Sequence, residues 1–496
     1  MQQAFSKLKL KSKASDAPDA APAVESGKAP TTKQIYQARF NFGVNFGSCF
    51  VLEKWIFHDL FSETDGDTEF DAVSSLVKKI GVEETQKKFE NHWNSYVTQD
   101  DWNWLAAHEV ASIRLPIGYW DVDGGSFTGG YKFGPYKKVY ANAWTTIKKF
   151  IEAAAAQKIS VLIDIHAVPG GANDSGHSGE PNADGAFWSD DKAQNEIAKM
   201  AGWIANDLKG YDNIAGIEVV NEASFENNPK KQQRYYGACL TEIRKSDEQV
   251  PVVISDGWWP DQWVKWVQSE QGEGYLGVVV DDHVYRCFSD ADKAKSPKQI
   301  IDDLNGDVLT NLNDSGAGVD FIVGEWSCVI DSQSWEKGGN RDEDVKQFGQ
   351  TESKLFNVRA AGSYFWTFKF QSGNGGEWDF KTMFDKGDIL PPPKPSKQPS
   401  EDELNQAATN AADSHQNYWK QQKTTIEPEV YKGGFVAAWK DADAFAKFNG
   451  SRIGRKEALK WAALQGLIKS KGGVKNTWEF SQGYDEGLKQ FYSAAV

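Results

Sequence analysis

The amino-acid sequence predicts an α/β fold of the (β/α)8-barrel class, preceded by a disordered arm and followed by a helical extension. Short apolar, β-branched segments alternate with amphipathic segments, which is the pattern of parallel strands joined by crossover helices. The chain has eight such strand segments, the number at which a parallel sheet closes into a barrel. Nearly all carry a polar or aromatic side chain near the C-terminal end, where (β/α)8 enzymes assemble their sites.

The expected strands are short apolar runs that stop at turn-forming or polar residues. They cover residues 40–47, 112–119, 160–167, 214–222, 251–258, 277–285, 320–327 and 361–369. Helical periodicity follows at residues 83–90, 141–157, 192–209, 230–245, 297–313 and 343–358. A further helix should begin after Thr98, because Asp101 stands three residues later and completes a capping box.

Two of the strands end in a glutamate. The first reads I-A-G-I-E-V-V-N-E and ends at Glu222, and the second reads D-F-I-V-G-E-W and carries Glu325. A carboxylate that closes an apolar strand lies where the barrel opens to solvent, held rigidly and partly desolvated. We therefore expect a pair of carboxylates on one rim, with Glu222 as general acid/base and Glu325 as nucleophile of a retaining glycoside hydrolase.

The amino-acid composition indicates which classes of binding partner are unsuited to this protein. A net charge of −15 and a pI near 5.1 argue against nucleic acid and against an anionic membrane surface, since both select a basic face. The 20 tryptophans fit a carbohydrate site, because sugars stack on indole, but a large aromatic core would explain them equally well. No apolar run is long enough to span a membrane.

The cysteines and the N-terminus favour a cytoplasmic protein. Four scattered cysteines without a C-x-x-C motif do not suggest a disulfide framework. The first residues, M-Q-Q-A-F-S-K-L-K-L-K, lack the apolar run of a secretory signal.

Three regions are expected along the chain. Residues 1–33, rich in Lys, Ala, Ser and Pro, predict a disordered arm. Residues 34–393 hold the catalytic barrel, which ends at the proline run P-P-P-K-P. Residues 394–496 predict a linker and amphipathic helices packed on the barrel, which either shape the substrate entrance or form an oligomer contact. The oligomeric state is not predicted.

Eight sequence blocks, in order, resemble glycoside hydrolase family 5, and within it the fungal exo-β-1,3-glucanases (glucan 1,3-β-glucosidases). The blocks are G-V-N-F-G-S-C-F-V-L-E at 43–53, H-W-N-S-Y-V-T-Q-D-D at 92–101, I-R-L-P-I-G-Y-W at 113–120, I-D-I-H-A-V-P-G at 163–170, V-V-N-E at 219–222, V-V-V-D-D-H-V-Y at 278–285, G-E-W-S at 324–327 and F-W-T-F-K at 365–369. The resemblance spans roughly residues 40–393 and implies a (β/α)8 barrel that cleaves β-glucosidic bonds by double displacement.

The resemblance assigns roles to the residues around the two glutamates. It implies that Arg114 and Tyr285 bond the nucleophile Glu325 and that Asn221 contacts the sugar 2-hydroxyl. A guanidinium and a phenol favour an ionised Glu325, whereas burial and the negative neighbour are expected to keep Glu222 protonated.

The remaining implied residues contact the sugar or its neighbours. His166 and His283 complete a polar shell, Trp366 forms the floor under the sugar, and Glu53 binds a substrate hydroxyl. Trp326 is also expected near the sugar.

The other histidines are assigned no role in the site. They are His58, His92, His108, His177 and His415. No cofactor and no metal are expected, because the chain has no H-E-x-x-H motif, although D-D-H at 281–283 imitates a metal triad.

One departure from the family leaves the substrate open. The secreted exoglucanases close their pocket with two phenylalanines; here Ser175 or a neighbour takes the first place, while Phe288 is a candidate for the second. We therefore expect a β-glucan oligosaccharide or another β-glucoside as substrate, with an exo-β-1,3-glucanase as the first hypothesis. The alternatives are a β-glycosidase of small glycosides or rutinose-type conjugates with transglycosylation activity, and a non-catalytic carbohydrate-binding protein.

Overall fold

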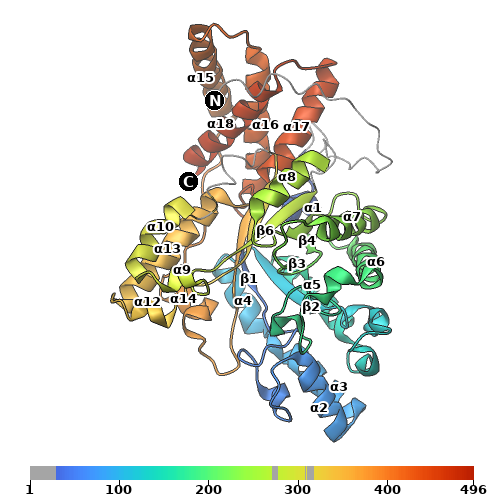
Figure 1. The fold of residues 1–496 in the computed structure, drawn as a ribbon. Coiled ribbons are helices and arrows are strands. Elements are labelled where there is room, and N and C mark those ends of the chain that lie inside the picture. The colour runs from blue at the N-terminus through green and yellow to red at the C-terminus, as the bar shows by residue number, and fades with distance from the viewer. Residues whose placement is uncertain (1–28, 271–276, 308, 310–317) are drawn as a thin grey trace.

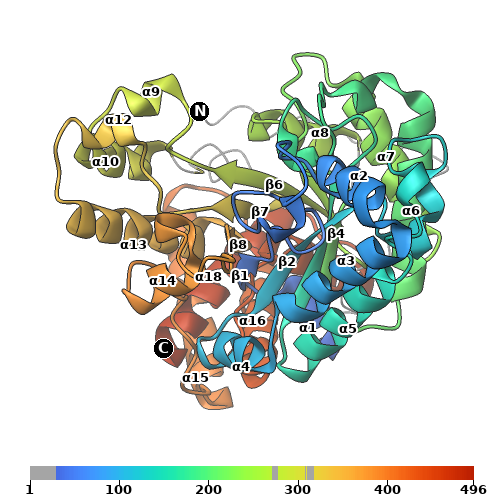
Figure 2. The ribbon, with the colours of Figure 1, turned by 90° about the horizontal axis from the view of Figure 1, so that it is seen from below.

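The computed structural model describes residues 29–270, 277–307, 309 and 318–496. Eight parallel strands close into a barrel in the order of the chain, so the predicted fold class is confirmed (Figure 1). Helices surround the strands, as Figure 2 shows in a view from below, turned by 90°. The strands are β1 Asn41–Asn45, β2 Ser112–Gly118, β3 Ser160–Ala167, β4 Ile214–Glu218, β5 Val252–Ser255, β6 Val278–Val284, β7 Asp320–Trp326 and β8 Gly362–Phe365.

The helices of the barrel fall close to the periodic segments. Thr98 caps α4 through the expected box with Asp101. The predicted helix at 297–313 is described only as far as Asp307. The helices are α1 Thr32–Ala38, α2 Glu69–Ile80, α3 Val82–Tyr96, α4 Gln99–Ala107, α5 Ala143–Ala156, α6 Asp191–Leu208, α7 Lys230–Arg244, α8 Pro260–Glu270, α9 Asp290–Lys293, α10 Pro297–Asp307, α12 Ser332–Trp335, α13 Arg341–Arg359 and α14 Phe380–Asp385.

The side chains of each strand alternate between two faces of the barrel wall, and both faces are buried. One set faces outward into the main core under the helices, as Ile163 and Ile165 do. The other set fills the barrel interior, where Leu162, Val253 and Ile322 form an apolar layer. Arg114 lies in register with Leu162 and therefore also points inward.

Strand β4 is shorter than the apolar run suggested. The prediction extended it to Glu222, but the strand ends at Glu218. Glu222 has a φ of 40°, in the left-handed region, so regular strand geometry cannot continue through it. Backbone hydrogen bonds still tie Val219 to β5 and Asn221 to β3, which carries the chain to the strand-end face of the barrel.

The predicted N-terminal arm lies mostly outside the described residues, which begin at residue 29. Its last two residues belong to α1, because Thr31 caps that helix and α1 starts at Thr32. None of the described helices is long and apolar enough to cross a bilayer.

Four helices after the proline run form a bundle with its own apolar core, here called the C-terminal bundle. They are α15 Glu401–Gln421, α16 Pro428–Lys447, α17 Lys456–Lys471 and α18 Thr477–Ala495. The sequence patterns indicated helices at the first three but not at α18. Helices α16 and α18 approach so closely that a Cβ on Gly483 would lie 2.0 Å from the carbonyl oxygen of Tyr431, so glycine is needed there.

The C-terminal bundle covers the end of the barrel at which the strands begin (Figure 1, red). Asp320, the first residue of β7, accepts hydrogen bonds from the backbone N–H groups of Glu457 and Ala458 in the first turn of α17. Arg39, just before β1, pairs with Ile453. The strand-end glutamates lie at the opposite end of the barrel, so the bundle does not shape the entrance to their site.

Asp320→Ala is expected to lower the free energy of unfolding by about 0.5–2 kcal/mol, the cost of losing a helix-capping carboxylate. Asp320→Asn should lose less, because it keeps an acceptor oxygen. Urea unfolding measures the effect, with Asp302→Ala as control, since Asp302 is exposed and its ion pair is with Lys298 on the same helix. The kcat should be unchanged; a loss of activity without a loss of stability would contradict this placement.

Candidate active site

A pocket of about 860 Å³ opens at the strand-end face of the barrel. Its walls come from the segments that follow β1, β3, β4, β5, β6 and β8. Seven of the residues expected in the site line it: Glu53, His166, Glu222, Tyr285, Phe288, Glu325 and Trp366. The other three, Arg114, Asn221 and His283, are buried among them. The structure thus brings all ten expected side chains to one place.

Glu325 is held at both carboxylate oxygens. Arg114 Nη1 donates to Oε1 at 3.0 Å, and the Tyr285 hydroxyl donates to Oε2 at 2.8 Å. Glu325 is 6% exposed, so these two donors replace the solvent that the carboxylate lost on burial. The two contacts fix the orientation of the carboxylate, with one oxygen toward Arg114 and the other toward Tyr285.

Glu222 lies beside Glu325. An oxygen of each carboxylate and a ring nitrogen of His283 all lie within 4.8 Å of one another. His283 Nδ1 is 2.9 Å from Glu222 Oε1, and the Asn173 amide donates to the Glu222 backbone carbonyl at 2.8 Å. A separation of about 5 Å is the one that retaining glycosidases use, whereas inverting enzymes leave room for a water between the carboxyl groups.

The expected protonated state of Glu222 is wrong, because the groups around it favour the ionised form. Burial acts to raise its pKa, but His177 and His283 outweigh burial and lower that pKa to about 2. Burial opposes a charge on His283, yet Glu325 and Asp281 raise the pKa of His283 well above its ordinary value. These shifts favour a charged His283 beside an ionised Glu222, and the His283–Glu222 pair titrates as a unit.

Arg114 is the centre of a buried polar network. Its Nε and Nη2 donate to both oxygens of Glu218, and Nη2 also lies 3.0 Å from Asp164 Oδ2. Nη2 donates to the side-chain oxygen of Asn221 at 2.8 Å. One guanidinium thus fixes Glu325 and Asn221 while neutralising carboxylates that have no access to water.

Arg114→Met is expected to cost about 3–5 kcal/mol of stability, because it leaves buried carboxylates without their counter-charge. Urea unfolding of the variant measures the loss. Adding Glu218→Leu should recover part of it, since the double change removes a charge together with its partner. An Arg114→Met protein as stable as the parent would contradict the network.

The floor of the pocket is built by His166, Trp366 and Glu53. His166 Nδ1 lies 2.7 Å from Asp164 Oδ2, and its ring stacks on Trp366 with centroids 5.8 Å apart. Burial raises the pKa of Glu53 to about 7, although the nearby His166 acts against the increase. Glu53 also accepts a hydrogen bond from Trp55 Nε1 at 2.8 Å.

Exposed aromatic rings surround the mouth of the pocket. Trp55, Trp258 and Phe288 are 50%, 49% and 61% exposed. Phe288 stacks on Trp378 from the loop after β8, with centroids 6.2 Å apart. Ser175 lines the pocket, at the wall where the related exoglucanases are expected to carry a phenylalanine.

Two expectations about individual residues are wrong. His177, which was given no part in the site, lines the pocket with Nε2 3.2 Å from Glu222 Oε2. Trp326, expected near the sugar, is 1% exposed and packs on Phe356 and Phe365 in the outer core. Side chains alternate along a strand, so the neighbour of inward-facing Glu325 must face outward.

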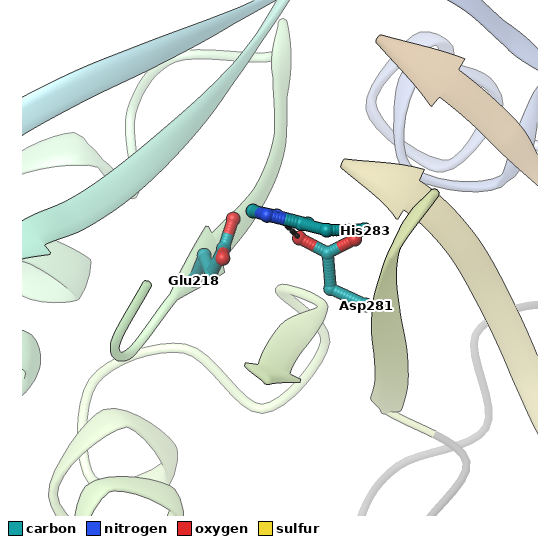
Figure 3. Close-up of side chains that lie close together, drawn as sticks. All are labelled: Glu218, Asp281 and His283. Carbon is teal, nitrogen blue, oxygen red and sulfur yellow. Dashed lines mark hydrogen bonds and ion pairs between the residues drawn. The ribbon is translucent and has the colours of Figure 1, made fainter. Parts of the chain in front are cut away.

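The buried residues Glu218, Asp281 and His283 offer ligand atoms within 4.8 Å of one another (Figure 3). Their atoms already have partners: Glu218 accepts twice from Arg114, and Asp281 accepts from Gly324 N–H and lies 3.2 Å from His283 Nε2. A divalent cation would have to displace the guanidinium, so the cluster fits an ion-pair network rather than a metal centre.

Comparison with known proteins agrees with this geometry. The model of the family "Cellulase (glycosyl hydrolase family 5)" matches residues 77–372. The model "Glucan 1,3-beta-glucosidase 3 C-terminal domain" matches residues 400–495, which hold the C-terminal bundle. The match to the first model covers more than half of the chain.

Relatives and solved structures point the same way. An uncharacterized glycosyl hydrolase of Saccharomyces cerevisiae is 39% identical, over 95% of this chain and 94% of its own. Glucan 1,3-beta-glucosidase 3 of Schizosaccharomyces pombe is 31% identical, over 91% and 95%. The rutinosidase of Aspergillus niger shares the fold, with a TM-score of 0.56 and 18% identity over 72% of this chain and 99% of its own. The chain therefore belongs to glycoside hydrolase family 5 and is a glycosyl hydrolase.

Proposed function

We propose that the protein is a retaining, exo-acting β-glucosidase with β-1,3-glucosidic bonds as its first substrate class. The observation that carries the proposal is the pair of carboxylates, Glu222 and Glu325, with oxygens within 4.8 Å of one another. That separation suits a double displacement through a glycosyl-enzyme. The relative named glucan 1,3-beta-glucosidase 3 supports the linkage.

In the first step, Glu325 attacks the anomeric carbon as the glycosidic bond breaks. Arg114 and Tyr285 hold its carboxylate in position, and the electrons of the broken bond go to the leaving oxygen. Glu222 gives that oxygen a proton, which it receives from His283 along the 2.9 Å contact. The alcohol leaves, and glucose stays bound to Glu325 as an ester.

In the second step, Glu222 acts as a base. Water attacks the anomeric carbon, its proton passes to Glu222, and the ester bond to Glu325 breaks with its electrons returning to the carboxylate. Both displacements invert, so the product keeps the β-configuration.

Action at a chain end is part of the proposal and follows the resemblance to exoglucanases. Segments after six different strands contribute to the pocket, including Glu53 and Asp67 after β1, Trp258 after β5 and Phe288 after β6.

A second candidate function is hydrolysis of small glycosides or disaccharide conjugates, with transglycosylation. The exposed rings of Trp55, Trp258 and Phe288 favour it, because a flat aglycone or acceptor would bury their apolar surface at the pocket mouth. The non-catalytic alternative loses support, since both carboxylates are present and paired.

A substrate panel separates the candidates. Laminari-oligosaccharides, aryl β-glucosides and rutinosides are incubated with the protein, and proton NMR follows the anomer first released. The proposal predicts β-glucose from the oligosaccharides one unit at a time. Release of rutinose and transfer to added alcohols, with no action on the oligosaccharides, would support the second candidate; α-glucose as first product would reject a retaining mechanism.

We also propose that the protein acts in the cytoplasm. All four cysteines are unpaired and buried, a state that a reducing compartment preserves. A fluorescent fusion in the source cell tests this, with diffuse signal expected and signal in secretory compartments as the contrary result.

A further inference from the structure

Residues 62–68 lead from the loop after β1 into α2, and Lys54 in the pocket wall binds this segment. Lys54 Nζ donates to the backbone carbonyl oxygens of Thr64, Asp65 and Gly66, at 3.3, 3.2 and 3.1 Å. A lysine ammonium has three N–H donors, so these contacts can occupy all of them. The first part of the segment is therefore held beside the pocket.

The chain just after the segment is held by two further hydrogen bonds. The backbone N–H of Leu52 donates to Glu69 Oε2 at 2.7 Å. The backbone N–H of Phe70 donates to the carbonyl oxygen of Gly179, in the loop after β3, at 3.0 Å. Asp67 thus stands between two anchored stretches of backbone.

The carboxylate of Asp67 is an acceptor on the pocket wall. Asp67 is exposed and lines the pocket. Among the residues that the structure describes, none forms a hydrogen bond or an ion pair with its side chain. An ionised carboxylate only accepts hydrogen bonds, so its natural ligand is a group that carries hydroxyls. Because the backbone on both sides is anchored, the acceptor is in place before a ligand arrives.

Neighbouring contacts place Asp67 on the side of the pocket from which the leaving group departs. A Cβ on Gly176 would lie 3.9 Å from Thr68 Cγ2, so the loop after β3 passes beside Asp67. The same loop carries His177, with Nε2 3.2 Å from Glu222 Oε2. Glu222 is the group that gives the leaving oxygen its proton in the first step proposed above.

The pocket offers two kinds of surface to a leaving group. Asp67, Ser175 and His177 provide hydrogen-bonding groups, whereas Trp258 and Phe288 provide aromatic rings. A sugar has an apolar C–H face and a rim of hydroxyls, so it can use both surfaces at once. A flat aryl group without hydroxyls can use only the rings and leaves the carboxylate without a donor.

We propose that Asp67 is a specificity-determining residue that accepts hydrogen bonds from the hydroxyl groups of a sugar leaving group. The inference rests on the double displacement proposed above and assigns it an oligosaccharide, rather than an aryl glycoside, as the preferred substrate. The leaving sugar is bound in the transition state of the first step and has departed before the second. Asp67 should therefore act on kcat/KM for oligosaccharides.

The test compares two substrates that differ in their leaving groups. For Asp67→Ala, we expect kcat/KM for laminaritriose to fall by roughly 10–100-fold, the effect of losing a hydrogen bond to a charged group. The kcat/KM for 4-nitrophenyl β-glucoside should fall by less than about three-fold, because nitrophenol offers Asp67 no hydroxyl during the reaction. Asp67→Asn keeps one acceptor oxygen and should lie between Asp67→Ala and the parent.

Two further variants distinguish this contact from a general effect on the loop. Asp65→Ala is the matched control, because Asp65 is exposed, does not line the pocket and gives Lys54 only its backbone oxygen. Its kinetics should match the parent on both substrates. Lys54→Met removes the anchor but keeps the carboxylate, so it should lower the ratio of kcat/KM for laminaritriose to that for the aryl glucoside. Thermal unfolding checks that each variant is folded.

A folded Asp67→Ala protein that loses equally on the two substrates, or loses nothing on laminaritriose, would overturn the inference. The parent protein would still cleave laminaritriose in that case. Failure of the proposed function looks different, because the parent itself would then not act on laminari-oligosaccharides. A parent that cleaves only the aryl glucoside would contradict both the β-1,3 assignment and the role of Asp67.

Discussion

Glu325→Gln should lower the kcat for every β-glucoside by a factor on the order of 10⁴ or more, since it removes the group that attacks the anomeric carbon. An amide is a poor nucleophile, and the change leaves Arg114 without its 3.0 Å carboxylate partner on this side. Steady-state assays with aryl glucosides and laminari-oligosaccharides measure the loss. Substrates with good leaving groups should not restore activity. Such a leaving group makes the general acid unnecessary, but the reaction still needs the nucleophile that the variant lacks.

Glu336→Gln is the matched control, because Glu336 is exposed and does not line the pocket. Its kcat should equal that of the parent. Thermal unfolding should show that Glu325→Gln is folded, since the substitution removes one negative charge from a crowded buried cluster. Full activity in a folded Glu325→Gln protein would contradict the nucleophile assignment.

Glu222→Ala should lose about 10²–10⁴-fold in kcat/KM for substrates with poor leaving groups, which is the usual contribution of a general acid. The loss should be much smaller for 2,4-dinitrophenyl β-glucoside, whose departure needs no proton. Turnover of that substrate would then be limited by the missing base in the second step.

Azide should rescue Glu222→Ala with the dinitrophenyl substrate, because the anion fits the space of the lost carboxylate and attacks without a base. The expected product is β-glucosyl azide, identified by NMR. α-Glucosyl azide from this variant, or azide rescue only in Glu325→Ala, would reverse or reject the two assignments.

The barrel could be predicted well from sequence because its strands are locally encoded. Strand β3 has the bounds expected from its apolar run, 160–167. Strand β4 was placed too long, since the run continues to Glu222 although that residue adopts a left-handed φ. Apolar composition specifies burial but not the point at which the backbone leaves the sheet.

The site residues at strand ends could be predicted from the sequence, whereas those on loops could not. Nothing in the sequence around His177 marks it, because its partner Glu222 is distant in the chain and only the path of the loop brings them together. Trp326 could have been excluded by the alternation of side chains next to Glu325. The ionisation of Glu222 could not be foreseen, since it depends on two histidines from separate loops and strands.

The position of the C-terminal bundle on the barrel also could not be predicted from the sequence. The amphipathic patterns indicated helices, but contacts between distant parts of the chain, such as that of Asp320 with the start of α17, show which end of the barrel they cover.

The most direct test of the central claim is covalent trapping with 2,4-dinitrophenyl 2-deoxy-2-fluoro-β-glucoside, followed by mass spectrometry of the intact protein and its peptides. The fluorine slows both steps, and the activated leaving group lets the first proceed, so the ester accumulates. The account predicts one fluoroglucosyl group per chain, attached to Glu325 and absent from Glu325→Gln. A label on any other residue, or an active protein that never acquires one, would contradict it.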